Sequence, residues 1–587
     1  PLLGRVRLLE AGDGKISKFS GEGAALARRA ERYQMQTTPM LRKYRMIAAD
    51  KKLTHDVLQN AGCGYILPKQ ACFLRFYYFG LGDDVARTLQ ASEDDLIVLK
   101  LLNRSRAAGV VVTPVDELED VLNDLLTPPK FLDSWFAQHL KQMKHVSTGD
   151  LGITAGSFEE HCRHWWANEC PVFVAERMCA SMPTERDGQR FDGTMRVGFV
   201  LRQRETPDTA AKGAVEATGA GTLQEEPPVE HFKKLDIDWL GGYWKLPQKP
   251  IDGGDLRDRV VSAARKSGTA PVRQAHLVEV YTALSESIRR LFGSIEPTSQ
   301  GLAQQYEHTP ELAGFFITRL TSSSKEVSRG RRLLYESSML ARKMKPNWAK
   351  SCLESFIHRA IGVLELRLAA APEAADWKSA LLNFKSAIKV QPTNANAWYL
   401  VGTADLMMGE PTRAVESLNR ALLLDPDFKA PYVNLGVAYL RQGEHERAIE
   451  ISEAGLARHP DTPQCQYHIA VACCQLCLFE EARESGGVWL SMSEAAAYEA
   501  LRSRSLEAFR KARESDIGAN RRPRSAAAAA ATAGTGEEAA AGAATRPSGG
   551  AGARQAPWLA VDDTMIQAMS VVTRPTAAGR GRPRFVD

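Results

Sequence analysis

Long apolar runs are missing from this sequence, because no stretch approaches the roughly 18 uninterrupted apolar residues of a membrane-spanning helix. A membrane protein of that kind is therefore not expected. An excess of one charge is also missing, since 75 lysines and arginines against 70 aspartates and glutamates leave a net charge of +5. This balance gives no reason to expect general binding to nucleic acids or membrane surfaces.

Cysteines are few and show no regular pairing, with ten in 587 residues. This usage favours a reducing compartment, and we expect the protein in the cytoplasm. The chain begins at Pro1 rather than Met, so a targeting signal that preceded it would not be visible.

Two groups of side chains are of types that bind zinc. The first is His161, Cys162, His164 and Cys170, and the second is Cys473, Cys474 and Cys477. The spacing of the first group matches no standard zinc motif and two tryptophans adjoin it, so we favour a packed helix over a zinc site. The second group falls on a repeat helix where small apolar residues belong, so core packing is again favoured.

With 44% hydrophobic and 25% charged residues, the chain is long enough for two or three cored domains. The clearest feature is a repeat of 34 residues, shown by Pro392, Pro426 and Pro460. Alanines recur with the same spacing about ten residues before each turn, at 380, 414, 448 and 482. Self-similarity at this period indicates an array of paired helices, each burying its apolar face against its neighbours.

These motifs resemble the tetratricopeptide repeat (TPR) family, which implies a solenoid with a concave groove for a protein or peptide. The first-helix positions that line such a groove hold Tyr399, Thr403, Asn434, Gln464 and His468. Some family members grip chaperone carboxylate tails there with a clamp of Lys, Asn and Arg, of which only the Asn is present. Chaperone tails are therefore not expected, and an unknown peptide or protein segment is the predicted partner.

Upstream, residues 96–100 and 109–113 read as two strands joined by a short polar loop. The loop offers backbone N–H groups and Ser105, Gly109 begins the second strand, and Lys100 supplies a positive charge. Such an arrangement could hold phosphate. The alternative is a purely structural hairpin, since one lysine on a strand is a weak signal.

Further strands follow at 172–178, 192–201 and 239–247. The first carries Glu176 where its apolar run stops, the second carries Arg196 near its start, and the third combines aromatics and glycines and includes Lys245. A stretch of that last kind suits a strand beside a ligand or a tight packing site. Residues 205–230 are predicted to form a flexible insertion, and a helix predicted over 274–292 closes the domain.

The order of these elements resembles the ATP-grasp superfamily over roughly residues 45–295. The resemblance implies ATP and Mg²⁺ as cofactors, with Lys100, Ser105, Gly109 and Glu176 binding the nucleotide. It also implies Arg196 and Lys245 as candidate catalytic residues. Two features depart from the family: alanines replace glycines in the lid loop, and no Glu-x-Asn metal motif follows the closing helix, so the metal ligands are unknown.

The sequence thus predicts a multidomain fold: an α+β ATP-grasp-like domain, an all-α TPR solenoid and a disordered C-terminal tail. The predicted segments are 1–45 (extension), 46–299 (ATP-grasp-like, with 205–230 inserted), 300–368 (connecting helices), 369–492 (TPR array), 493–520 (capping helix) and 521–587 (low-complexity tail). Arg580–Arg584 in the tail resemble a DNA minor-groove motif, but in so biased a segment DNA contact is not expected.

Two functions remain open. One is an ATP-binding protein, an ATP-dependent carboxylate–amine ligase if it is active, whose TPR array recruits the substrate or a partner. The alternative is a non-catalytic TPR scaffold in a larger protein assembly, which the missing metal motif favours. The sequence leaves enzymatic activity undecided.

Overall fold

The structure, a computed structural model, describes residues 50–103, 109–139, 158–179, 181–203, 235–247, 249–253, 268–293, 298–323, 327–368, 376–460, 462–485 and 507. Ser105, the N-terminal extension, the 205–230 insertion, the capping helix apart from residue 507, and the tail with Arg580–Arg584 lie outside these ranges. The chain divides into two compact units, Pro1–Pro431 and Tyr432–Asp587.

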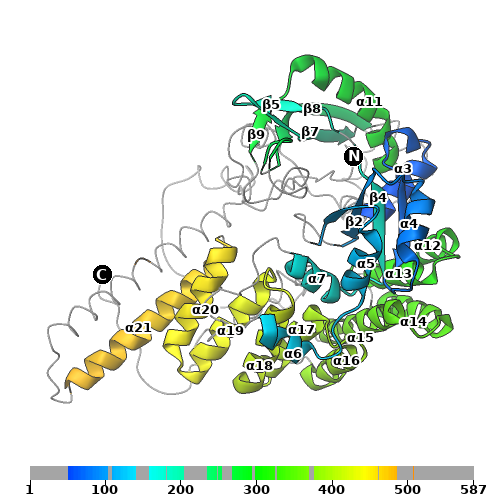
Figure 1. Ribbon diagram of the computed structural model, residues 1–587. Coiled ribbons are helices and arrows are strands. Elements are labelled where there is room, and N and C mark those ends of the chain that lie inside the picture. The colour runs from blue at the N-terminus through cyan, green and yellow to red at the C-terminus, as the bar shows by residue number, and fades with distance from the viewer. Residues whose placement is uncertain are drawn as a thin grey trace, which may run out of the picture. The chain divides into compact units, whose positions relative to one another are not determined.

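The first unit contains a four-stranded antiparallel sheet in the order β1-β4-β2-β3. Figure 1 labels its strands β2 and β4. Its strands are β1 (Gln70–Leu74), β2 (Leu96–Leu101), β3 (Val111–Pro114) and β4 (Val172–Arg177). The strands predicted over 96–100 and 172–178 are confirmed as β2 and β4. The strand predicted from Gly109 begins two residues later, because Gly109 has a φ of +66° and turns the chain into β3.

Helices pack their apolar side chains on this sheet. They are α4 (Leu81–Leu89), α5 (Leu118–Leu126), α6 (Leu132–His139) and α7 (Phe158–Trp166). Trp165 of α7 is fully buried and lies 5.4 Å from the ring of Phe173 on β4. One core therefore joins the sheet to α4, α5 and α7.

A second antiparallel sheet has the order β7-β8-β9, with β5 and β6 forming a separate pair. These strands are β5 (Thr184–Arg186), β6 (Gln189–Phe191), β7 (Thr194–Gln203), β8 (Leu235–Lys245) and β9 (Thr269–Pro271). Helix α11 (Gln274–Gly293) packs on them through Leu277 and through Tyr281, whose ring stacks on Trp239 at 4.1 Å. A Cβ on Gly242 would come within 2.7 Å of Leu277, so this glycine of β8 allows α11 to pack closely.

Helices form the rest of the first unit and the start of the second. After α3 (Lys51–Asn60) and the short η2 (Gly64–Ile66), they are α12 (Ser299–Gln305), α13 (Pro310–Ser323), α14 (Val327–Lys343), α15 (Trp348–Leu368), α16 (Trp377–Val390), α17 (Ala395–Met407), α18 (Pro411–Leu424), α19 (Lys429–Gln442), α20 (His445–Arg458) and α21 (Pro463–Ser485).

The 34-residue period of the sequence is the period of these helices. Helices α16, α18 and α20 begin at residues 377, 411 and 445, and α17, α19 and α21 begin at 395, 429 and 463, each step being 34 residues. In the best repeat, Gly402 of α17 lets α18 approach closely, because a Cβ there would lie 2.6 Å from Leu418. The predicted helix-turn-helix array is confirmed.

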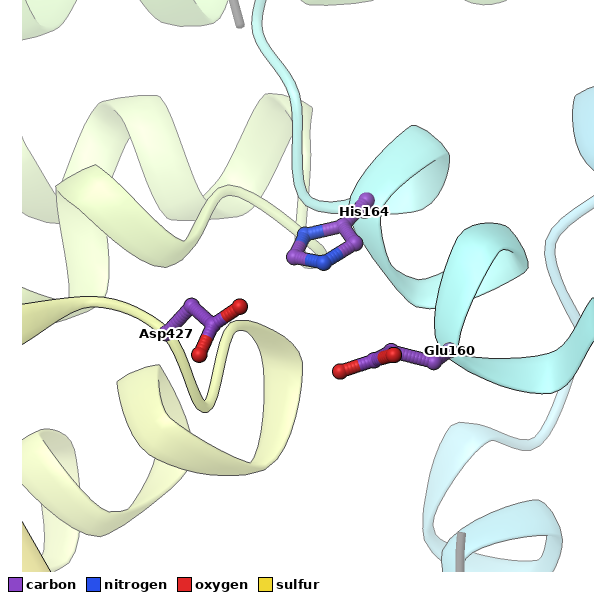
Figure 2. A group of neighbouring side chains, drawn as sticks. All are labelled: Glu160, His164 and Asp427. Carbon is purple, nitrogen blue, oxygen red and sulfur yellow. The ribbon is translucent and has the colours of Figure 1, made fainter. Parts of the chain in front are cut away.

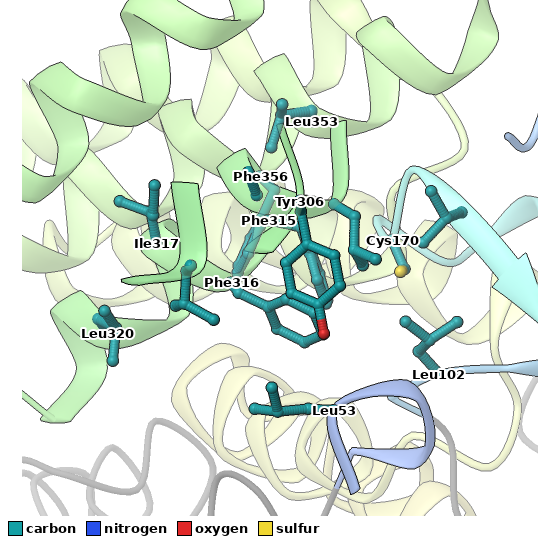
Figure 3. Packing of buried hydrophobic residues seen from close by; sticks show 14 of the residues in the cluster. Leu53, Leu102, Cys170, Tyr306, Phe315, Phe316, Ile317, Leu320, Leu353 and Phe356 are labelled. Carbon is teal, nitrogen blue, oxygen red and sulfur yellow. The ribbon is translucent and has the colours of Figure 1, made fainter. Parts of the chain in front are cut away.

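The largest core of the first unit joins α3 and the first sheet to helices α11–α15. Tyr306 packs against Phe316 at 5.5 Å, and Figure 3 shows their rings among Leu53, Phe315 and Leu353. Polar contacts support this core: Tyr306 donates to Asp56 at 2.9 Å, and Asp50 caps α3 while accepting from Arg319 at 2.7 Å. The α+β segment and the connecting helices α12–α15 therefore form one packed body. In the part of the chain that the structure describes, no helix is long and apolar enough to cross a membrane.

Candidate functional site

Lys100 and Glu176, two of the predicted nucleotide-binding residues, lie side by side on the first sheet. Lys100 is opposite Val174 and Glu176 is opposite Val98, so the two side chains are diagonal neighbours on one face. The ammonium of Lys100 donates to Glu176, which also accepts from the side-chain amide of Gln70 at 2.7 Å. Burial opposes ionisation of Glu176, but Lys100 and Gln70 outweigh it and hold the pKa of this carboxyl below its usual value.

Gly109, also predicted to bind nucleotide, has a structural role in the described contacts. Its carbonyl accepts a hydrogen bond of 2.8 Å from the indole N–H of Trp165. A Cβ at this position would lie 2.7 Å from Leu101, and the positive φ adds strain for any other residue. Gly109 therefore allows α7 to pack closely against the sheet. Its contact with phosphate stays a prediction.

Arg196 and Lys245, the candidate catalytic residues, lie on the second sheet. Arg196 is opposite Tyr243, and Lys245 is opposite Thr194 and Thr269. Burial lowers the pKa of the Arg196 guanidinium, against the opposing influence of Tyr243. The first sheet thus brings Lys100 and Glu176 together, whereas the two catalytic candidates come from a separate sheet.

The described residues around this pair do not fit the Mg²⁺ that the ATP-grasp resemblance implies. Both oxygens of Glu176 already accept hydrogen bonds, one from Lys100 and one from Gln70. Within the described ranges, no group of three metal-ligand side chains is found at this pair. Mg²⁺ requires several oxygen ligands in nearly octahedral arrangement, so we derive no step through a metal here.

The residues predicted to line a TPR groove are mostly buried, which corrects the prediction. Tyr399 and Thr403 of α17 are each 1% exposed, and Asn434 and His468 are 0% and 3% exposed. Tyr399 packs edge-to-face on Phe428 at 4.9 Å. Of the five, only Gln464 is half-buried.

His468 is a packing residue of the second unit. A Cβ on Gly436 would come within 2.5 Å of its ring, so α19 and α21 approach closely at this point. Burial lowers the pKa of His468 to about 4. A neutral imidazole in this position fits helix packing rather than recognition of an anionic ligand.

Helices α6 and α7 contact the start of the array inside the first unit. The guanidinium of buried Arg163 donates to the carbonyls of Leu422 and Leu423 at the end of α18. Phe136 packs with Ala395 and Leu424 in a small core. The segment around α6 and α7 therefore binds repeat helices of its own chain.

A polar network lies beside this contact. Glu169 accepts two hydrogen bonds from Arg359 of α15, at 2.7 and 2.8 Å, and one from Asn394 at 3.3 Å. Gln391 donates at 2.8 Å to the carbonyl of Asn168, and Asn394 also caps α17 by accepting from Ala397. Sequence reasoning missed this network.

The sequence signal for these contacts was the mostly apolar composition of α17, whose residues 399–406 read Tyr-Leu-Val-Gly-Thr-Ala-Asp-Leu. Residues 399–406 of this helix are buried without a break, whereas a groove-lining helix should leave a polar stripe to solvent. A helix with few polar side chains on any face is expected to be packed against other elements on all sides.

The two cysteines of the first zinc-like group, Cys162 and Cys170, are core packing residues. Cys162 faces the core beneath the first sheet, and Cys170 belongs to the larger core. Burial raises the pKa of Cys162 to about 12 and that of Cys170 well above its usual value, so neither favours the thiolate that zinc binds. Cys473 is likewise fully buried in α21, and Cys474 is half-buried.

Comparisons with known proteins concern the repeats. Residues 405–472 match the tetratricopeptide repeat family. Superkiller protein 3 of Schizosaccharomyces pombe (strain 972 / ATCC 24843) is 31% identical over 206 residues, which cover 34% of this chain and 13% of that protein. The chain thus spans a small part of this relative's length.

Solved structures with similar helices include MamA and YrrB, the latter described as a TPR protein with an unusual peptide-binding site. MamA is 18% identical with a TM-score of 0.26, covering 36% of this chain and 93% of that chain. YrrB is 17% identical with a TM-score of 0.27, covering 38% and 97%. These values carry no conclusion about function, and the comparisons give no support to the ATP-grasp resemblance. Together with the observed helices, the family match shows that residues 405–472 are tetratricopeptide repeats.

Proposed function

We propose that this protein is a non-catalytic scaffold that uses its TPR array to hold another protein in a larger assembly. The observation that supports this most directly is the contact of α17 and α18 with helices α6 and α7. There, the carbonyls of Leu422 and Leu423 at the end of α18 accept hydrogen bonds from Arg163 of α7, and Phe136 of α6 packs with Ala395 and Leu424 of the repeats. These are the interactions by which repeat helices hold partner segments.

The partner is expected at the second unit, because Tyr399 and Thr403 are already covered. On α21, Tyr467 is 38% exposed and Gln464 is half-buried, and the two are three residues apart on one helix face. An aromatic ring beside an amide suits recognition of an extended peptide, since the ring supplies contact area and the amide binds peptide groups.

The test is isolation of the tagged full-length chain from its native cells, with identification and quantification of bound proteins. A scaffold should recover at least one partner in near-stoichiometric amount. The Gln464→Ala/Tyr467→Ala double variant should lose most of it, while Glu450→Ala at an exposed position of α20 should not. Recovery of the chain alone, or equal recovery with the double variant, would contradict the proposal.

A second candidate is nucleotide binding without turnover, favoured by the Lys100–Glu176–Gln70 cluster. A lysine and a carboxylate on adjacent strands suit a phosphate and the nucleoside of ATP. Phosphate would have to replace Glu176 as the partner of Lys100. The lack of a fitting Mg²⁺ site argues against ligase chemistry.

This candidate is tested by adding ATP and Mg²⁺ to the full chain and measuring its melting temperature and its heat of binding. A ligand that binds only the folded state at 100 times its Kd stabilises by about 2.7 kcal/mol. Lys100→Ala should remove the shift, and Lys389→Ala, at an exposed position of α16, should keep it. If ATP and Mg²⁺ do not raise the melting temperature of the wild-type protein, nucleotide binding is excluded and the scaffold function is the one that remains.

A further inference from the structure

Outside the cluster on the first sheet, three side chains with metal-ligand atoms meet where α7 faces the turn between α18 and α19. They are Glu160, His164 and Asp427, whose ligand atoms all lie within 4.8 Å of one another. Figure 2 shows the imidazole of His164 beside the two carboxylates, Glu160 from the same helix and Asp427 from the turn.

Local structure fixes both halves of this cluster. Glu160 and His164 are four residues apart on α7, so they lie on one helix face. The opposite side of α7 is anchored by Trp165, which is fully buried and donates to Gly109 at 2.8 Å. The helix therefore has little freedom to turn its two ligands away.

The turn that carries Asp427 is closed by backbone hydrogen bonds. Asp425 donates to Ala421 at 2.9 Å, and Phe428 donates to Asp425 at 3.1 Å. Arg163, next to His164, binds the carbonyls of Leu422 and Leu423 just before this turn. The two ligand-bearing segments are thus held together independently of the cluster.

A further carboxylate lies beside the imidazole. Oδ1 of Asp425 lies 3.6 Å from Nδ1 of His164, and both side chains are almost fully buried. A carboxylate facing one ring nitrogen favours the tautomer with its proton on that nitrogen, which leaves the other nitrogen as a metal ligand. Nε2 is then the nitrogen left to bind a metal.

We propose that Glu160, His164 and Asp427 bind a divalent transition-metal ion, with Zn²⁺ as its best match, that ties α7 to the α18–α19 turn. Ligand bonds of 2.0–2.2 Å in tetrahedral arrangement place ligand atoms about 3.3 Å apart, so the side chains need to close by up to about 1.5 Å. Asp427 is exposed and can make this adjustment by changing rotamer.

The ligand set decides the class of metal. One imidazole nitrogen with two carboxylates suits Zn²⁺ and its neighbours, whereas Ca²⁺ and Mg²⁺ prefer oxygen ligands alone. Three protein ligands leave a fourth position for water. Because the ligands come from the α+β segment and from the repeats, the ion stabilises the contact between them.

The experiment uses the full chain, stripped of metal with a chelator and titrated with Zn²⁺ alone. Bound zinc per chain is measured by mass spectrometry after dialysis, and the melting temperature is followed in parallel. His164→Asn and Asp427→Asn should each bind one zinc fewer than the wild-type protein and lose the zinc-dependent rise in melting temperature. Asp427→Asn, at an exposed position, is expected to fold normally.

Two further variants sharpen the comparison. Asp425→Asn should keep the site but weaken zinc binding by about 10- to 100-fold, as loss of an orienting partner does. His308→Asn is the matched control, because His308 is exposed and lies 3.3 Å from the carboxylate of Glu307. It should bind as much zinc as the wild-type protein.

Co²⁺ distinguishes this site from cysteine sites elsewhere in the chain. Bound at Glu160, His164 and Asp427, it should give visible absorption without thiolate charge-transfer bands, and Asp427→Asn should abolish that absorption. Equal zinc content in the wild-type protein and Asp427→Asn would overturn the proposal, as would loss of binding in His308→Asn. Partner recovery through α21 is a separate measurement, so either proposal can fail alone.

Discussion

The Glu169–Arg359 pair offers a sharp test of whether the α+β segment and the repeats form one cooperative body. The side chain of Glu169 is 6% exposed and that of Arg359 is 14% exposed. The pair is bidentate, Asn394 donates to the same carboxylate, and the guanidinium lies 5.0 Å from the ring centre of Phe356. Arg359→Met keeps most of the aliphatic stem and removes the charge.

The expected loss of stability comes from the buried carboxylate that Arg359→Met leaves without its ion-pair partner. Arg359→Met leaves the Glu169 carboxylate buried with only a 3.3 Å hydrogen bond from Asn394. Breaking a buried ion pair by removing one partner costs about 3–5 kcal/mol. At the low end of the usual 2–4 °C per kcal/mol, this lowers the melting temperature by roughly 6–10 °C.

The double variant Glu169→Met/Arg359→Met separates the lost charge from the lost packing. With both charges absent, no ion is buried alone, and the cost should fall to about 1 kcal/mol or less. A matched control is Arg332→Met, because Arg332 forms an exposed pair with Glu336 at 3.7 Å. Such surface pairs contribute about 0–1 kcal/mol.

The assay is urea unfolding followed by probes in both parts of the first unit, with tryptophan fluorescence as one probe. The reasoning requires Arg359→Met to lower the midpoint for both probes together. It is refuted if the single variant costs no more than Arg332→Met, or if the double variant is as unstable as the single one. Separate midpoints for the two probes in the wild-type protein would show that the body is not cooperative.

Three further predictions concern other parts of the chain. Gly402→Ala should destabilise the protein by about 1–3 kcal/mol, because the added Cβ overpacks against α18. Gly409→Ala meets nothing within 4 Å, but the residue has a φ of +84°, so backbone strain should cost about 1 kcal/mol. The urea unfolding midpoints of the two variants measure both effects. The pKa of His468 is lowered to about 4 by burial. As the pH falls, the unfolded state therefore takes up this proton at a higher pH than the folded state does. Stability is full above about pH 6.5 and falls, by up to roughly 3 kcal/mol, as pH drops through 4; a pH series in which His468→Gln keeps the same slope as the wild-type protein would contradict this. Lys100→Met should raise the pKa of Glu176, because burial then acts against the carboxylate without an ion-pair partner. Its stability deficit should therefore shrink on acidification, which thermal melts at several pH values can measure.

Local patterns made much of this fold predictable. The 34-residue spacing of prolines and alanines locates the paired helices, because each repeat needs small residues where its helices cross, as at Gly402 and Gly436. Alternating burial in β2 and continuous burial through most of β4 likewise follow from their apolar runs. These elements depend on residues close in sequence.

Contacts between distant segments were beyond the reach of such patterns. The sequence marks Lys100 and Glu176 separately, but only the strand order β4-β2 makes them neighbours. The pairing of Glu169 with Arg359 leaves no local signature, since each residue alone reads as a surface charge. The same holds for Asp427, which is an ordinary turn residue until α7 is placed opposite it.

The buried inner helix also explains why the chaperone clamp is missing. A clamp needs charged or amide side chains exposed to solvent until a ligand arrives. On α17 those positions are 1% exposed and lie within the packed first unit. A lysine in place of Tyr399 would bury an unpaired ammonium, which is far more costly than burying an aromatic ring. The replacement of the clamp by Tyr399 and Thr403 is therefore a consequence of how the first unit folds, and recognition of a partner has to use other residues of the array.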